Sequence, residues 1–391
     1  MPVLTRPSPD RPRFRRDRGD GGAIVVGFAL LMSSLVVVGM LALVVDVGQL
    51  YVEREELQNG ADAAALAAAR SCAQDEICDP LAFEEVAQSA AEQNASDGAA
   101  LAILRCTRID GMTSGPCPLN DPRLTKCVGS RPDTGNFVEI RTRTLSRDGR
   151  TLFPSYFGAA VLGKSFEGNQ ANACARAAWG PLASHPRVFG FGIAECAFEE
   201  LTSDPAGPGL VPIEQIKAGT PNPAQEAEIR QRQCANPEDP PSEDGPGALA
   251  WLGSSAGDCF QQLRAGADQP GSEIASDWSA ATCRHDGANK TLGEFLDDNR
   301  EPLVLPVYDS VTPGDQGTHT YHISGFAYFL PTGYRFGPEN AHPSWSTGND
   351  CGGADATPPD PCLTGFFTKG TVVGAVGAGD GYGLQAIQLI G

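Results

Sequence analysis

The hydrophobic pattern of the chain opens with one long run that carries no charge. Residues 23–45 read AIVVGFALLMSSLVVVGMLALVV, and only Ser33 and Ser34 interrupt the apolar side chains. As a helix these 23 residues rise about 35 Å, enough to cross a bilayer hydrocarbon core of about 30 Å. The pattern therefore predicts a transmembrane helix.

The flanks of this run set its expected orientation. Residues 1–21 contain six arginines against three aspartates, and positively charged flanks stay in the cytoplasm. We expect a cytoplasmic tail over 1–21 and an exported remainder. The alternative is a cleaved signal peptide, whose apolar region is normally about 7–15 residues and is followed closely by small residues. Here the run is longer, and the stretch Ala63–Ala69 lies well beyond it, which favours an anchor.

Helical periodicity continues past the apolar run. Offsets of three and four residues place one apolar stripe along the next 20 positions or so, made of Val47, Leu50, Tyr51, Leu57, Ala61, Ala64, Ala65 and Ala68. We predict one transmembrane and juxtamembrane helix over residues 22–70. Its first half would lie in lipid and its second half would pack on an exported domain.

A first exported domain is expected over residues 71–180. Phe137–Arg143 alternates with period two, as in a half-buried strand, and Ser146–Gly149 supplies a turn. Ser155–Leu162 is a candidate short helix, and Gly168–Trp179 follows as a second strand. The predicted fold class is α+β, with the long helix packed on a small antiparallel sheet.

The remainder, residues 181–391, is predicted to be a mostly β, loop-rich extension. Residues 202–247 are rich in Pro, Gly, Asp and Glu and indicate a long loop. Residues 251–296 carry helix and loop signals. Strands are expected at 303–309, where Pro306 favours an edge or a bulge, and at 318–330, 363–369 and 370–376.

Twelve cysteines lie after the apolar run, and none precedes it. An even number confined to the exported side favours disulfides over a zinc site, for which CxxC or CxxH pairs are missing. The shortest spacings, which bridges can close, are Cys72–Cys78, Cys117–Cys127 and Cys351–Cys362. Spacing alone leaves the pairing open. The extension is thus expected to be disulfide-rich.

The acidic balance of the chain, a formal charge of −19, argues against nucleic acid as a partner and fits a solvated surface.

The N-terminal segment resembles the TadE/TadG-like proteins of the Flp (Tad) pilus assembly system. The resemblance rests on Gly21-Gly22-Ala23 at the membrane entry and on Leu43–Gly48 at the end of the apolar run. It continues through the motifs Leu50–Arg54, Leu57–Asn59 and Ala61–Ala67. The segment is closer to the TadG side. TadE-like pseudopilins have a glutamate five residues after the cleavage glycine, whereas Gly27 stands there after Gly22, which leaves prepilin-peptidase processing open.

The later parts of the chain are similar to the same family by pattern rather than by motif. The strand, short helix and Ala-rich strand before residue 180 resemble the C-terminal part of TadE/TadG-like modules. The extension resembles that of some TadG-like proteins of actinobacteria. The resemblance implies a membrane-anchored structural or assembly component, like a minor pilin or pseudopilin, of a Tad/Flp-type pilus or secretion system.

The resemblance also implies partners and a location. The partners would be Tad/Flp pilus assembly membrane proteins, pilins and the lipid bilayer. The location would be the cytoplasmic membrane, crossed once, with the N-terminus inside and the C-terminal region extracytoplasmic. Gly27, Ser33, Ser34 and Gly39 are small residues on which transmembrane helices can associate, so a helix-mediated oligomer is also predicted. The alternative function is a surface-exposed adhesin or binding module on a single anchor.

A cell-surface enzyme has little support in the sequence. GxSxG, HExxH and Walker motifs are absent. Three residues apart on a strand, His319 and His322 point to opposite faces and do not suit one metal. Asp309–Thr312 lacks the second serine of the DxSxS loop of von Willebrand A domains, and no alternating βα pattern surrounds it. We therefore expect no enzyme activity and no catalytic, cofactor or metal residues.

Overall fold

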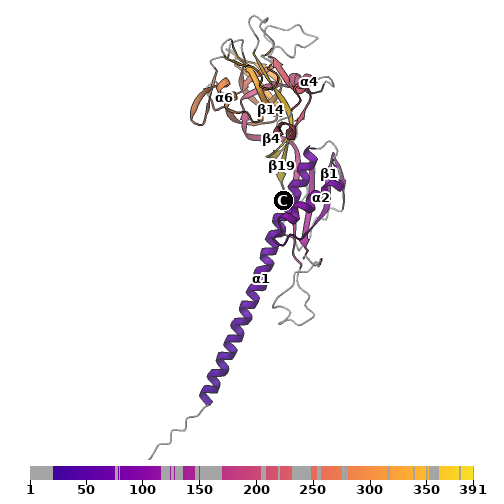
Figure 1. Ribbon diagram of the computed structural model, residues 1–391, viewed down its shortest axis with the longest axis vertical. Helices are drawn as coiled ribbons and strands as arrows, with labels where there is room; N and C mark the ends of the chain where they lie inside the picture. Colours follow the sequence, from indigo (N-terminus) through magenta and orange to yellow (C-terminus); the bar gives the residue numbers. More distant parts are fainter. Residues whose placement is uncertain are drawn as a thin grey trace, which may run out of the picture.

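The molecule consists of one long helix and a β-rich head at its C-terminal end (Figure 1). The head divides into a small unit around the helix and a larger unit beyond it, joined by β4 and β19 (Figure 1). The computed structural model describes residues 21–390 apart from the segments 75–77, 79, 116–123, 125–126, 128–134, 146–148, 150–169, 204–207, 219–220, 231–247, 253–256, 275–277, 279–280, 315–317, 338–339, 349–350, 352–360 and 378–379. The predicted cytoplasmic tail and the Ser155–Leu162 helix lie outside these residues.

Helix α1, Gly21–Gln74, forms as the sequence predicts and is a few residues longer than expected. Its 54 residues rise about 80 Å at 1.5 Å each. Ser33 and Ser34 do not interrupt it, because their hydroxyls donate to the backbone oxygens of Ala29 and Leu31 within the helix. The added turn carries Cys72, which is buried and bonded to Cys78 just before the next helix.

The second half of α1 packs on an antiparallel sheet together with α2, Pro80–Gln93. The sheet is formed by β1 (Ala100–Ile109), β2 (Met112–Ser114), β3 (Asn136–Thr144), β4 (Asn172–Phe189) and β19 (Leu384–Leu389), in the order β2-β1-β3-β4-β19. Small side chains let the helices approach the sheet closely. The fully buried alanines of α1 are Ala61, Ala64, Ala65, Ala68 and Ala69.

This unit confirms the predicted α+β arrangement, with one difference in the strands. The alternating segment Phe137–Arg143 lies in β3 as expected. The strand expected over Gly168–Trp179 begins only at Asn172 and continues to Phe189, through Pro181. The strand continues because Pro181, Gly180 and Trp179 all find partners in β19, the last strand of the sheet.

The larger unit is built on a small barrel of five strands. These strands are β5 (Phe191–Ala194), β8 (Leu249–Leu252), β10 (Ala267–Glu273), β13 (Leu303–Pro313) and β14 (His319–Arg335). They pair in the closed order β5-β8-β10-β14-β13-β5, with only the β13–β5 pair parallel. Closure leaves these strands without a free sheet edge at the paired positions.

Further elements surround the barrel strands. They are α4 (Glu195–Thr202), β6 (Val211–Pro212), α5 (Ile213–Lys217), the 3-10 helix η1 (Pro223–Gln225), β7 (Ala227–Arg230), β9 (Phe260–Arg264), β11 (Thr282–His285), β12 (Ala288–Thr291), α6 (Leu292–Asp298), β15 (Ala341–His342), β16 (Cys362–Val373), β17 (Ala375–Val376) and β18 (Asp380–Tyr382). Strand β16 pairs with β14 and with β19. It therefore connects the barrel to the sheet under α1.

The predicted strands of the extension are confirmed, whereas two expected loop regions form regular structure. Strands β13 and β14 form at the segments 303–309 and 318–330, and register shifts in β13 begin after Val307, next to Pro306. The two short strands expected at 363–369 and 370–376 form one strand, β16, which ends at Val373 and is followed by β17. Residues 251–296 form mainly strands instead of helix and loop. Their Asp286-Gly287 pair, both at positive φ, is the signal of a tight hairpin turn between β11 and β12. Residues 211–230 of the expected loop form β6, α5, η1 and β7.

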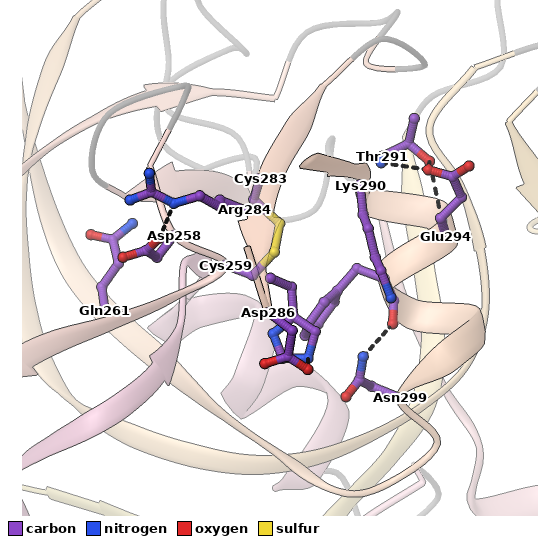
Figure 2. The surroundings of a disulfide bond; sticks show 12 residues. Asp258, Cys259, Gln261, Cys283, Arg284, Asp286, Lys290, Thr291, Glu294 and Asn299 are labelled. Carbon is purple, nitrogen blue, oxygen red and sulfur yellow. Dashed lines mark hydrogen bonds and ion pairs between the residues drawn. A yellow bond between two sulfur atoms is a disulfide. The ribbon is translucent and has the colours of Figure 1, made fainter. Parts of the chain in front are cut away.

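The cysteines form disulfides, as predicted. Four bridges join described pairs: Cys72–Cys78, Cys127–Cys174, Cys259–Cys283 and Cys351–Cys362. Cys106 and Cys196 are disulfide-bonded as well. The spacing of the cysteines left the pairing open. Two of the three short spacings are bridged, whereas Cys127 is bonded to Cys174 on β4 instead of Cys117. Figure 2 shows the Cys259–Cys283 bridge, which holds the β11–β12 hairpin against the start of β9.

Candidate functional site

The exposed half of α1 is the largest apolar surface on the described residues. Its bare side chains are Val25, Val26, Phe28, Leu30, Leu31, Met32, Val36, Val37, Met40, Leu41, Val44, Val45, Val47, Tyr51 and Val52. Soluble proteins seldom expose so large an apolar patch. Within the part of the chain that the structure describes, α1 alone is long and apolar enough to cross a membrane.

The exposed half ends where α1 meets the sheet. Leu57 is the first fully packed residue of the helix, and its backbone oxygen accepts a hydrogen bond of 2.7 Å from the Thr142 hydroxyl of β3. One residue on, the Gln58 side chain donates to the backbone oxygen of Cys174 at 3.0 Å and to Asp62 at 2.8 Å. The apolar half is thus the continuation of a helix that is fixed to the core of the head.

The small residues of α1 that could support helix association lie on more than one side of the helix. At 100° per residue, Gly27 and Ser34 lie within about 20° of each other around the helix, whereas Gly39 lies about 120° from Gly27. A Cβ added at Gly27 or at Gly39 would meet no neighbouring atom within 4 Å. Both positions are therefore open, on different sides of the helix.

A buried charge cluster lies on the sheet face opposite the helices. Glu139 accepts from Arg141 at 3.1 Å and from Arg176 at 2.9 Å, and all three side chains are buried. Arg176 also donates to the backbone oxygen of Cys127 at 3.0 Å. Glu139 and the two sulfurs of Cys127–Cys174 lie within 4.8 Å of one another. They are no metal site, because the sulfurs are bonded to each other and the carboxylate is paired with two arginines.

The two histidines of β14 make separate contacts. His322 Nδ1 lies 2.9 Å from Asp309 Oδ1 on β13. His319 sits two residues before Tyr321 and contacts its ring edge-on at 6.3 Å between ring centres. Asp309 belongs to β13, so the Asp309–Thr312 segment is strand rather than a metal-binding loop.

The larger unit also carries a surface hollow that the sequence does not predict. A shallow hollow, open to solvent, is lined by Leu296, Asp297, Arg300, Pro331, Thr332, Gly333, Tyr334, His342 and Trp345. These residues come from α6, from the end of β14 and from the segment after it. They lie up to 49 positions apart in the sequence, so no local motif brings them together.

The comparison with known families decides the nature of the N-terminal segment. Residues 22–71 match the family described as putative Flp pilus-assembly TadE/G-like. Residues 22–71 are a TadE/G-like domain. The matched range contains both the exposed half of α1 and most of the half that packs on the sheet, so it agrees with the resemblance in the sequence. No curated protein and no solved structure matches the chain.

The TadE/G-like domain ends just before the first disulfide. Its last matched residue, Ser71, precedes Cys72, which is bonded to Cys78. The family is one of assembly proteins, and no catalytic family matches. The TadE/G-like helix together with a disulfide-rich head is consistent with an exported or membrane location.

Proposed function

We propose that this protein is a membrane-anchored structural or assembly component of a Tad/Flp-type pilus or secretion system. The observation that carries the proposal is the TadE/G-like domain at 22–71, in which one helix supplies both an exposed apolar half and part of the core of the head. In this role the helix crosses the cytoplasmic membrane with residues 1–21 inside. Assembly membrane proteins and pilins of the system are its proposed partners.

The arrangement of α1 supports a role in assembly beyond simple anchoring. A plain anchor needs no fixed orientation relative to its head, because a flexible linker would serve. Here α1 is continuous from Gly21 to Gln74 and is bonded to β3 and β4 at Leu57 and Gln58. In this role, a partner that moves or orients the apolar half also moves or orients the head, because the two are joined by one continuous helix.

Topology is tested first, by labelling in intact cells. A reporter fused before Met1 should remain in the cytoplasm, and protease added from outside should cut only beyond about residue 70. A mature N-terminus near Ala69 would instead show a cleaved signal peptide and would overturn the anchor.

Assembly is tested by exchange of the helix. In the native host, the charge-free run at residues 23–45 is replaced by an unrelated transmembrane helix of equal length, with the head unchanged. Loss of filaments, with the protein still exported and folded, supports the proposal. Normal filament number and normal crosslinking to Tad membrane proteins would reduce α1 to an anchor.

A further inference from the structure

The larger unit holds an exposed tryptophan on a well-braced turn. Trp345 is 46 % exposed, whereas Trp179 and Trp251 are buried. Its turn follows β15 and lies on the end of β14. The indole therefore presents an apolar aromatic face to solvent on an ordered turn.

Hydrogen bonds to Glu226 hold the turn in place. The Glu226 carboxylate accepts hydrogen bonds from the hydroxyls of Thr332, Ser344 and Thr347. The Ser344 hydroxyl also accepts from the backbone N–H groups of Ser346 and Thr347, at 3.0 and 3.2 Å. Hydrogen bonds from three hydroxyl groups to one carboxylate are charge-assisted and therefore strong. They hold the turn in one conformation before any ligand arrives.

Close backbone approach completes the brace. A Cβ at Gly333 would lie 2.5 Å from the backbone nitrogen of Ser344 and 2.7 Å from the oxygen of His342. Only glycine allows the 342–345 segment to lie directly on β14. The backbone nitrogen of Trp345 then donates to the oxygen of Thr332 at 3.2 Å.

Polar groups from α6 lie beside the tryptophan in the same hollow. The Tyr334 hydroxyl donates to Asp297 at 3.0 Å. Burial, with Asp297 beside it, raises the pKa of Tyr334, so its hydroxyl stays a donor. One carboxylate oxygen of Asp297 remains available as an acceptor. Arg300, three residues later, adds guanidinium donors, and the His342 ring stacks on Tyr334 at 6.3 Å.

Helix α6 is itself held in place, which fixes Asp297; Arg300 follows two residues after the helix ends. A capping box between Thr291 and Glu294 starts the helix (Figure 2). Near its end, Lys290 donates to Asp298 at 2.6 Å. The hydrogen bond from Lys290 lowers the pKa of Asp298. Both sides of the hollow, the Trp345 turn and α6, are therefore ordered without a ligand.

We propose that this hollow binds a neutral saccharide. A sugar ring has an apolar C–H face, which suits the negative face of an exposed indole, and its hydroxyls both donate and accept. Asp297 accepts hydrogen bonds and Arg300 donates them, around one aromatic platform. The Nδ1–H of His342 donates to the backbone oxygen of Pro343 at 2.8 Å, which leaves Nε2 of the neutral ring as an acceptor. The charges of Asp297 and Arg300 cancel, so the site selects hydroxyls rather than a charged group. This inference does not depend on the assembly role.

Other ligand classes fit the hollow less well. Polyanions such as nucleic acid are repelled by a chain of net charge −19. An apolar or proline-rich peptide needs a continuous hydrophobic groove. Here Leu296 is buried, and the exposed part of the lining sets Trp345 beside the charged side chains of Asp297 and Arg300. Because the hollow is open on one side, single-site affinity is expected to be weak, at a Kd of about 1 mM. Clustered copies of the protein would raise the avidity.

The test is a binding array probed with the full chain in nanodiscs, displayed at high density. The array carries neutral oligosaccharides, anionic oligosaccharides and proline-rich peptides. Four proteins are compared: the native chain, Trp345→Ala, Trp345→Phe and the control Met112→Ala. Met112 is 75 % exposed and lies on the β1–β2 hairpin, away from the hollow. Thermal unfolding of each protein verifies that it is folded.

Retention of neutral oligosaccharides, lowered about tenfold or more by Trp345→Ala and only partly by Trp345→Phe, supports the proposal, provided that Met112→Ala binds normally. If Trp345→Ala does not fold, Asp297→Asn decides the matter. The amide oxygen of this variant still accepts from Tyr334, but the amide carries no charge. The variant should lower binding of the same oligosaccharides several-fold. Binding of peptides in place of sugars, sugar binding unchanged in these variants, or no retention at all would each overturn it.

Discussion

The side-chain hydroxyl of Thr142 donates to the backbone oxygen of Leu57 at 2.7 Å, in the middle of an otherwise regular helix. The backbone oxygen of Leu57 already accepts a hydrogen bond within α1, so the Thr142 hydroxyl of β3 gives this oxygen a second one. The contact marks the boundary between two halves of the helix. Before it the side chains face outward, and after it they form the core beneath α2 and the sheet.

The first prediction separates these two halves with one substitution. Leu57→Asp places a charge among buried alanines and should destabilise the head by about 4 kcal/mol or more. Val52→Asp, five residues earlier on the exposed part of α1, should change the stability by less than about 0.5 kcal/mol. Guanidinium unfolding in detergent, followed by tryptophan fluorescence, measures both. Trp179 lies in the same core cluster as Leu57 and reports on it. Equal losses in the two variants would contradict the boundary.

The second prediction concerns the buried charges. Arg176→Met removes one of the two partners of Glu139, whose side chain is 1 % exposed, and should cost about 3–5 kcal/mol because the carboxylate keeps too few partners. The matched control is Arg284→Met, which breaks the exposed pair with Asp258 and should cost far less, because solvent screens a surface ion pair. Both are measured by denaturant titration. A cost at Arg176 no larger than that at Arg284 would mean that water reaches Glu139.

The third prediction is the disulfide map and its ranking. Non-reducing peptide mapping should recover the linked pairs Cys72–Cys78, Cys127–Cys174, Cys259–Cys283 and Cys351–Cys362. In the chain-entropy account, loss of the 47-residue bridge at Cys127–Cys174 costs about 4 kcal/mol. Loss of the 11-residue bridge at Cys351–Cys362 costs about 3 kcal/mol. Double serine variants measure the difference. A peptide linking Cys117 to Cys127 would disprove the pairing.

The fourth prediction uses the two open glycines of α1. Small residues let membrane helices approach one another, and Gly27 lies on the same side as Ser34 while Gly39 does not. If the Gly27–Ser34 side is the assembly face, Gly27→Leu should lower crosslinking to Tad membrane proteins several-fold. Gly39→Leu should leave that crosslinking and the fold of the head unchanged. The reverse pattern would place the assembly face on the Gly39 side, and equal crosslinking in both variants would mean that neither glycine contributes.

Sequence periodicity predicted the elements that carry a strong local signal. Helix α1 was predictable because charge-free residues and an alanine stripe at helical spacing extend over more than 40 positions. Strand β14 was predictable because THTYHISGFAYFL favours a strand at nearly every position. The β11–β12 hairpin was missed although Asp286-Gly287 is a strong turn signal, since its flanking strands are only four residues long and polar.

Features that depend on distant partners were not predictable in this way. Cys127 is ten residues from Cys117, but the fold places it against Cys174 on the outer face of β4. The extension of β4 through Pro181 depends on β19, some 200 residues later. The hollow at Trp345 needs Glu226, Asp297 and Thr332 together, and only the tertiary fold juxtaposes them.

In the proposed topology, the position of β19 also sets the order of events during export. Its residues 385–389 pair with 177–181 of β4, so that edge of the sheet beneath α1 stays open until nearly the whole chain has crossed the membrane. Contacts this distant in sequence form late and slowly. The small unit around α1 is therefore expected to complete its fold only after the larger unit has been exported. A chain stalled before residue 384 would expose the unpaired edge of β4, which can pair with other chains.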